Sequence, residues 1–300
     1  MRNKKPLDVY QHVTDHIVAA IEANPGEYRM PWQRSGFGAT LPRNAHTKAL
    51  YQGLNTVWLW CAAEQKQYEH AIWASFKQWQ QMGCQVRAGE KGTVIVFYKQ
   101  YEVDPNPDHE SDDGKRMALK YSHVFNAAQV DGYEVPSLPQ TPPLERHELM
   151  RKLVAVSGVK VLTGGDSAYY HMGKDLIQMP DDRCFQQTEA AERTFHYEST
   201  LAHELIHATG HKSRLARDMT GRFGSESYCM EELCAETGAA FICAHLGISA
   251  EPRTDHAQYL HHWLRVMKAD KKAIFTAAAK ASEATRYLLS FLVKEVAHAA

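Results

Sequence analysis

Apolar residues recur every four positions near the start of the chain, from Val9 to Ile21. This spacing places them on one face of a helix and predicts an amphipathic helix over residues 7–23. An Asn-Pro-Gly sequence follows directly and would end that helix. Further helices are predicted over residues 55–67 and from about residue 75 onward.

The pattern then changes to one that favours strands. Residues 84–87 and 93–98 flank the turn-like sequence 88–92, which predicts a β-hairpin, and residues 121–125 predict a strand that returns beside it. Residues 104–114 are acidic, polar and rich in turn-forming residues, so we expect a surface loop there.

The segment from Pro136 to Pro143 contains four prolines and is the best interdomain linker in the chain. We therefore predict an N-terminal domain over residues 1–135, a linker over 136–144 and a C-terminal domain over 145–300.

The C-terminal part is predicted to be mainly helical with a short sheet. The expected helices cover residues 145–156, 189–209, 228–246, 255–268 and 270–296, and the expected strands cover 159–162, 167–171 and 175–179. The whole chain is therefore predicted to have an α+β fold, with a small α+β domain followed by a mainly helical one.

Composition and charge narrow the function only slightly. Hydrophobic and charged contents of 44% and 23% are ordinary for a soluble globular protein, and the net charge of −1 supports no whole-chain affinity for nucleic acid or membranes. Residues 1–102 nevertheless carry 12 Lys and Arg against 8 Asp and Glu, which hints at an anionic partner. Six cysteines without a CxxC pair, and the lack of a signal core or membrane-spanning run, predict a cytoplasmic protein with reduced thiols.

The clearest chemical signal is an HExxH sequence within the predicted helix 189–209. His203 and His207 are four residues apart, so both imidazoles lie on one helical face and can bind one Zn²⁺ ion. Glu204 can contact a metal-activated water molecule without binding the metal. A strand-like segment, 175–179, precedes the motif, as the substrate-edge strand of a zincin would.

A third ligand must come from elsewhere. The pattern HExxHxxGxxH fails, because Ser213 occupies the position of the third histidine and His211 lies two residues too early. A glutamate from the following helix is the alternative. Glu232 is predicted as this ligand, and Glu236, one turn further on, as a residue that orients a ligand histidine.

Neighbouring residues leave part of this assignment open. The roles of Glu232 and Glu236 could be exchanged, since both share one helical face. Glu231 points about 100° away and is interpreted as a solvated or salt-bridging residue. Cys234 lies on the opposite side of the helix from Glu232, which argues against a cysteine ligand. The predicted cofactor is Zn²⁺, with another divalent metal as an alternative.

A His2Glu set with an open position is the arrangement of catalytic rather than structural zinc sites. In peptide hydrolysis Glu204 would act as the general base. A further side chain must stabilise the oxyanion, and we consider Tyr170, His211 and Tyr228.

Aromatic and basic residues alternate in the N-terminal third, as in proteins that stack unpaired bases and contact phosphates. The predicted DNA-binding residues are Trp32, Arg34, Arg43, Tyr51, Trp73, Lys77, Trp79, Arg87 and Lys91. A structural alternative is that Trp58, Trp60, Trp73 and Trp79 form the core of a small domain.

Short sequences in both halves carry a resemblance to a known family. They include Pro31-Trp32-Gln33, Tyr51-Gln52-Gly53-Leu54-Asn55, Val86-Arg87-Ala88-Gly89-Glu90-Lys91-Gly92, His203-Glu204-Leu205-Ile206-His207 and Glu231-Glu232-Leu233-Cys234-Ala235-Glu236. Together and in this order they resemble the ArdC-type antirestriction proteins of conjugative plasmids. The N-terminal region also resembles a region fused to plasmid primases.

The resemblance implies an N-terminal domain that binds single-stranded DNA, a zincin-like metallopeptidase domain, and protection of plasmid DNA from host restriction during conjugation. A protein substrate linked to host restriction is a further expectation. Two other hypotheses stay open: a zinc protease whose N-terminal half recognises proteins, and a DNA-binding protein whose metal domain is not catalytic.

Overall fold

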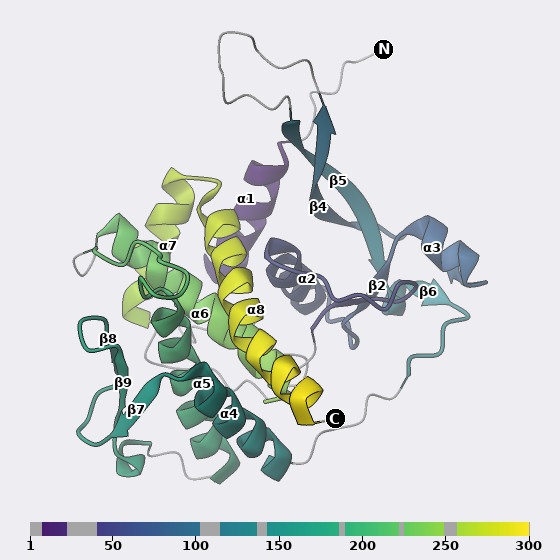
Figure 1. Ribbon diagram of the computed structural model, residues 1–300. Coiled ribbons are helices and arrows are strands. Elements are labelled where there is room, and N and C mark those ends of the chain that lie inside the picture. Colours follow the sequence, from purple (N-terminus) through teal and green to yellow (C-terminus); the bar gives the residue numbers. More distant parts are fainter. Residues whose placement is uncertain are drawn as a thin grey trace.

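Figure 1 shows the computed structural model of the chain. The structure describes residues 8–22, 41–102, 115–136, 143–185, 190–221, 225–248 and 257–299. Among these residues, no helix combines the length and the apolar character needed to cross a membrane.

The N-terminal half combines helices with a small sheet. Its helices are α1 (Val9–Glu22), α2 (Leu54–Gln65), α3 (Phe76–Gln81) and the 3-10 turn η1 (Ala127–Gln129). Its strands are β1 (Arg43–Asn44), β2 (Ile72–Ala74), β3 (Gln85–Val86), β4 (Thr93–Glu102), β5 (Lys115–Asn126) and β6 (Val130–Asp131). The main sheet has the order β1-β2-β5-β4, and β3 pairs separately with β6.

The predicted hairpin between residues 84–87 and 93–98 is wrong, because β3 pairs with β6 and not with β4. The buried side chain of Gln129 explains the difference: its amide donates to Glu90 Oε2 at 2.8 Å and to the Lys91 carbonyl at 3.1 Å. These bonds attach the expected turn to η1, which precedes β6.

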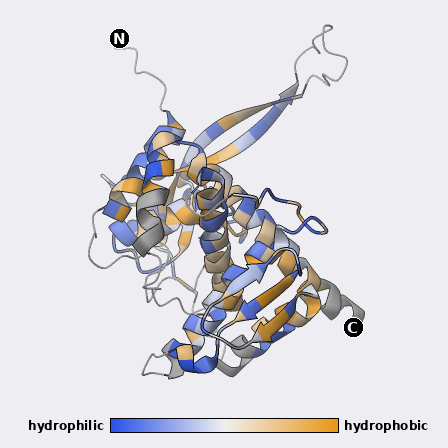
Figure 2. Ribbon diagram, turned by 90° about the vertical axis from the view of Figure 1, so that its left-hand side faces the viewer, coloured by the Kyte–Doolittle hydropathy of each residue, from blue (hydrophilic) through white to orange (hydrophobic). Residues whose placement is uncertain are grey.

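The predicted strand at residues 121–125 is confirmed and is longer than expected. It belongs to β5, which pairs antiparallel with β4 from Thr93↔Val124 to Glu102↔Lys115. These two strands form a ribbon that projects from the molecule (Figure 1). Hydrophilic and hydrophobic residues alternate along it (Figure 2). The predicted loop 104–114 lies outside the described residues.

The C-terminal half is mainly helical, as predicted. Its helices are α4 (Pro143–Ser157), the 3-10 turn η2 (Asp182–Cys184), α5 (Ala190–Thr209), α6 (Glu226–Leu246), α7 (Ala257–Ala269) and α8 (Ala273–Ala299). A small sheet is formed by β7 (Lys160–Thr163), β8 (Tyr169–His171) and β9 (Leu176–Met179) in the order β7-β9-β8. The segment 175–179, expected as an edge strand, is thus the central strand. These elements establish the predicted α+β fold.

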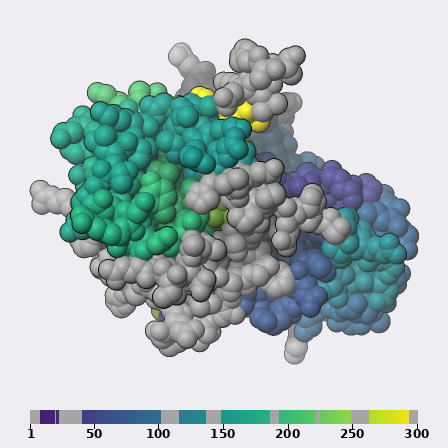
Figure 3. All heavy atoms as spheres, turned by 90° about the horizontal axis from the view of Figure 1, so that it is seen from below, coloured from purple at the N-terminus to yellow at the C-terminus, as the bar shows by residue number. Residues whose placement is uncertain are grey.

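Both halves contribute to one hydrophobic core. Val13 of α1 and Trp60 of α2 belong to the same buried cluster as residues of α5, α6 and α8, and Trp60 packs on Phe241 with ring centroids 5.8 Å apart. Seen from below, the described residues of the C-terminal half lie mostly on the left and those of the N-terminal half mostly on the right (Figure 3). The division into residues 1–135, 136–144 and 145–300 stays a prediction.

Candidate metal centre

Helices α5 and α6 hold the candidate metal centre between them. The Ser225 hydroxyl caps the start of α6 by accepting from the Tyr228 amide at 3.3 Å, and Gly247 ends the helix in the left-handed conformation. Gly238 lets the two helices approach closely, because a Cβ there would lie 2.7 Å from the side chain of Ile206. That contact is one residue from His207, so the close packing sets the distance between the histidines and α6.

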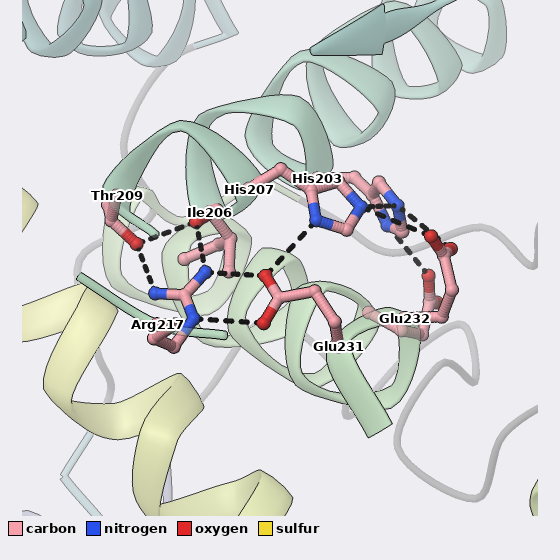
Figure 4. Close-up of polar contacts among 8 residues, drawn as sticks. His203, Ile206, His207, Thr209, Arg217, Glu231 and Glu232 are labelled. Atoms are coloured by element: carbon pink, nitrogen blue, oxygen red, sulfur yellow. Dashed lines mark hydrogen bonds and ion pairs between the residues drawn. The ribbon is translucent and has the colours of Figure 1, made fainter. Parts of the chain in front are cut away.

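The side chains of His203, His207 and Glu232 point toward one another across the helix pair (Figure 4). The two histidine Nε2 atoms are 3.1 Å apart, and Glu232 lies 3.5 Å from Nε2 of His203 and 3.4 Å from Nε2 of His207. All three residues are buried. They are the one group of three metal-ligand side chains found to converge among the described residues.

These distances fit a tetrahedrally coordinated metal ion. Ligand atoms about 2.0–2.1 Å from Zn²⁺ lie about 3.3–3.4 Å from each other in a tetrahedron. The two Nε2 atoms, 3.1 Å apart, are close to that value, and the Glu232 carboxylate lies at a similar distance, with Oε2 3.5 Å from His203 Nε2 and Oε1 3.4 Å from His207 Nε2. Two imidazoles and one carboxylate also form the donor set of catalytic zinc sites.

The electrostatics of the group favour positive charge where the three side chains meet. Burial alone would lower the pKa of His203, but Glu232 and Glu236 raise it to about 9. Burial would also lower the pKa of His207, but Glu231 and Glu232 raise it to about 10. Conversely, burial would raise the pKa of Glu232, and the two histidines hold it far below its usual value.

Each histidine has a carboxylate at its other ring nitrogen. His203 Nδ1 lies 3.5 Å from Glu236 Oε2, and His207 Nδ1 lies 3.2 Å from Glu231 Oε1. A carboxylate on Nδ1 favours the tautomer that keeps the Nε2 lone pair for a metal, and it fixes the ring orientation. Glu236 thus lies beside His203, and its role as a residue that orients a ligand histidine stays a prediction.

Glu231 is more important than the sequence analysis indicates. It is a salt-bridging residue, but it is buried and not solvated. The Arg217 guanidinium donates to both of its carboxylate oxygens, at 3.0 and 2.6 Å. Arg217 also donates to the Ile206 carbonyl at 2.7 Å and the Thr209 hydroxyl at 2.6 Å, so it joins the end of α5 to α6 (Figure 4).

Tyr170 and His211, both proposed as oxyanion donors, are bonded to other side chains. The Tyr170 hydroxyl donates to Asp175 Oδ1 at 2.6 Å, and Asp175 also pairs with Arg214. His211 Nδ1 lies 2.7 Å from the Ser213 hydroxyl. Tyr228, in the first turn of α6, is half-buried. The oxyanion assignment therefore stays open.

The predicted DNA-binding residues have very different environments. Arg43, Lys77 and Lys91 are exposed, and Tyr51 is half-buried with its hydroxyl accepting from Asn44 at 3.1 Å. Arg87 is exposed but already contacts Glu90, Asp131 and the Ala128 carbonyl. Trp32 and Arg34 lie outside the described residues.

Trp73 and Trp79 do not offer a stacking surface. Both are fully buried: Trp73 packs edge-on with Tyr68, and Trp79 donates from Nε1 to the Phe125 carbonyl at 3.1 Å. Trp58 and Trp60 are buried as well. All four tryptophans therefore agree with the alternative interpretation as core residues, because their large apolar rings pack inside the fold.

Exposed aromatic rings occur instead on the β4–β5 ribbon. Phe97 and Tyr101 are 45% and 47% exposed, and Tyr98 and Tyr121 are 55% and 46% exposed. None of these four residues is among the DNA-binding residues predicted from the sequence. Their alternation with Lys99 and Lys120 was the available signal.

Two protein-family models match the chain, one in each half. The family described as zincin-like metallopeptidase matches residues 148–280, and the N-terminal domain of anti-restriction factor ArdC matches residues 7–125. An uncharacterized protein of Sinorhizobium fredii, y4eC, is 42% identical over 283 residues, covering 93% of this chain and 90% of that protein. A DNA primase TraC of Escherichia coli is 32% identical over 98% of this chain but only 28% of the primase.

Two crystal structures of the antirestriction ArdC protein from plasmid R388 resemble the whole chain. The metal-free form has a TM-score of 0.76 and 34% identity, covering 96% of this chain and 99% of that one. The Mn(II)-bound form has the same TM-score and 35% identity, covering 95% and 98%. The chain belongs to the ArdC family of antirestriction proteins.

Proposed function

We propose that this protein protects the DNA of a conjugative plasmid from host restriction, binds single-stranded DNA and hydrolyses peptide bonds at a metal centre. The convergence of His203, His207 and Glu232 at ligand-to-ligand distances of 3.1–3.5 Å carries the metal-centre proposal. Zn²⁺ is the proposed ion, and Mn²⁺ is an alternative supported by the Mn(II)-bound relative.

The residues around the ion would divide the catalytic work. A bound divalent cation supplies the polarisation of a carbonyl group and of a water molecule. Glu204, buried and adjacent to His203 on α5, would take the proton from that water molecule and deliver it to the leaving amine. Glu231 and Glu236 would hold the two histidine rings in place.

A direct test measures metal binding and peptide hydrolysis separately. Protein stripped with a chelator is titrated calorimetrically with Zn²⁺ and with Mn²⁺, and one ion per chain is expected. The loaded protein is then incubated with a denatured protein mixture, with Glu204→Gln as the control. Binding without any cleavage that depends on Glu204 would favour a non-catalytic metal domain, and no binding would refute the proposed centre.

The DNA-binding part of the proposal is supported by one face of the β4–β5 ribbon. Successive pairs on this face are Phe97 with Lys120, Lys99 with Ala118, and Tyr101 with Arg116. Because alternate residues of a strand share a face and directly paired residues lie on the same side, aromatic and basic groups are interleaved here. Rings provide stacking surfaces for unpaired bases, and cations contact phosphates.

This part is tested by titrating the full chain with a fluorescent oligothymidine and with a duplex of equal length. Single-stranded DNA is expected to bind more tightly, because a duplex hides its base faces. Affinity should fall as salt rises. Equal affinity for both forms, or no binding at low salt, would overturn DNA binding and favour an N-terminal half that recognises proteins.

A further inference from the structure

A second region with the chemistry for nucleic acid lies where the two halves of the chain meet. A cavity of about 710 Å³ opens between α8 and the N-terminal half. Tyr10 of α1, Asn55 of α2 and Tyr98 of β4 line one side of it, and α8 forms the other side. Helix α8 runs beside α2 in this region (Figure 1).

The α8 side of the cavity is basic. Lys272, directly before the helix, and Lys280 and Arg286 within it line the cavity, and Glu283 is the one carboxylate among the described lining residues. The neighbouring Lys271 differs, because its ammonium is paired with Asp8 at 2.5 Å. Three cations around one cavity are complementary to an anionic chain.

The opposite side of the cavity presents aromatic rings. The Tyr10 and Tyr98 hydroxyls lie 3.0 Å apart, and the Lys272 ammonium lies 5.3 Å from the centre of the Tyr10 ring. Tyr98 is 55% exposed, so part of its ring is open. It follows Phe97 on β4 and faces the other side of the ribbon, so the cavity adjoins the strand that carries the first aromatic-basic face.

The start of α2 adds to the same electrostatic pattern. Gly53 precedes the 12-residue helix and, as a glycine, offers no side chain to cap the first amide groups. A Cβ at Gly53 would approach only the Ala278 carbonyl, at 3.9 Å, so the backbone here is accessible from the cavity. Helix N-termini attract anions, and this one lines a cavity that already contains three cations.

We propose that this cavity binds the phosphodiester backbone of single-stranded DNA, with Lys272, Lys280 and Arg286 as phosphate contacts and Tyr98 as a stacking surface. The inference rests on the proposed DNA binding and extends it to a helix of the C-terminal half. The cavity volume is that of a site for one drug-sized molecule. Such a site fits a short segment of one strand and excludes a paired duplex.

The test compares two triple variants of the full chain. The first combines Lys272→Ala, Lys280→Ala and Arg286→Ala. The second, Lys160→Ala with Lys174→Ala and Lys212→Ala, removes the same charge from exposed positions of β7, the β8–β9 turn and the segment after α5. Binding of a fluorescent oligothymidine is measured by anisotropy at several salt concentrations, and circular dichroism checks folding.

We expect the cavity variant to reduce the slope of log affinity against log salt by about 2, because each phosphate contact on single-stranded DNA contributes about 0.7. The charge-matched control should leave the slope unchanged. If the wild type binds DNA and both triple variants behave alike, the cavity proposal is overturned while DNA binding stands. If the wild type does not bind, both proposals fail.

Tyr98 provides a check that does not depend on charge. Tyr98→Phe keeps the ring and should bind the oligothymidine as tightly as the wild type does. Tyr98→Ala removes the ring and should weaken binding about 5- to 150-fold, which corresponds to the 1–3 kcal/mol of one stacked base. Equal binding by both Tyr98 variants would overturn the stacking role.

Discussion

The candidate metal centre and the β4–β5 ribbon place their candidate functional side chains in opposite environments. His203, His207 and Glu232 are buried between two packed helices, and each histidine has a carboxylate on its second nitrogen. Phe97 and Tyr101 are nearly half exposed on a projecting ribbon. The first arrangement suits a small ion in fixed geometry, whereas the second leaves ring faces exposed, as the proposed binding of a flexible polymer requires.

This difference determines how substitutions should act. At the proposed metal centre, removing one buried ligand should leave the other ligands in place, so we expect the loss in metal binding. On the ribbon, removing one exposed ring should leave the fold intact, so we expect the loss in the proposed DNA binding. If replacing an exposed ring unfolded the protein, or if replacing a buried ligand left metal binding unchanged, the role assigned to that residue would be refuted.

The largest expected effect is at the ligand histidines. His203→Ala or His207→Ala should abolish stoichiometric zinc, because each removes one of three protein ligands. Glu204→Gln should retain the ion, since we assign Glu204 to the water molecule. Metal content after dialysis, measured by mass spectrometry, is the readout. Complete zinc loss in Glu204→Gln would show that Glu204 is a ligand.

The convergence of the candidate ligands could be predicted from the sequence because much of their geometry is local. The spacing of His203 and His207 on one helix fixes their common face before any tertiary contact is known. Glu232 needed one more assumption, that the next acidic helix packs against the first. The contact between His207 and Glu231 depends on how α5 and α6 cross, and no spacing along either helix encodes that angle.

The next largest expected effect is a loss of stability when a buried aromatic residue, rather than an exposed one, is replaced. Trp79→Ala should destabilise the protein by about 3–5 kcal/mol, because it empties a packed site and removes the bond to the Phe125 carbonyl. Phe97→Ala should change stability by less than about 0.5 kcal/mol but weaken binding of single-stranded DNA. Urea denaturation and oligothymidine titration measure the two effects. Unchanged stability of Trp79→Ala would contradict its core role.

The same contrast explains why exposed aromatic residues were harder to predict than the candidate metal ligands. Trp73, Trp79, Phe97 and Tyr101 all occur among basic residues, and composition does not distinguish a ring inside the fold from one outside it. The distinction arises from β3 pairing with β6 and from β4 pairing with β5. Those pairings bring together residues up to 46 positions apart in the case of Gln85 and Asp131, which local patterns cannot specify.

A smaller effect is expected from residues that contact the ligands without binding the ion. Glu231→Ala and Glu236→Ala should each weaken zinc binding about 10- to 100-fold, and Glu232→Ala should weaken it more. Glu226→Ala is the matched control, because Glu226 is an exposed acid on the same helix. Competition with a chromogenic chelator gives the affinities.

The order of these variants is the informative result. A greater loss in Glu236→Ala than in Glu232→Ala would exchange the roles of ligand and orienting residue. Arg217→Lys sharpens the test at Glu231, because lysine keeps the charge but cannot donate two parallel bonds to one carboxylate. It should lie between the wild type and Glu231→Ala.

The smallest expected effect distinguishes two exposed arginines of the N-terminal half. Arg43 lies on β1 and donates to the Lys48 carbonyl at 2.9 Å. This acceptor is neutral, so the bond does not neutralise the charge of the guanidinium. Arg87 already contacts the carboxylates of Glu90 and Asp131. A cation that is engaged with carboxylates contributes little to the release of counterions from DNA.

Arg43→Ala should therefore lower the salt slope of oligothymidine binding by about 0.7, whereas Arg87→Ala should leave it nearly unchanged. Lys91→Ala serves as a second exposed cation and should match Arg43→Ala. If Arg87→Ala gave the larger change, its ion pairs would have to open on binding, and the phosphate path would run along β3 instead of β1.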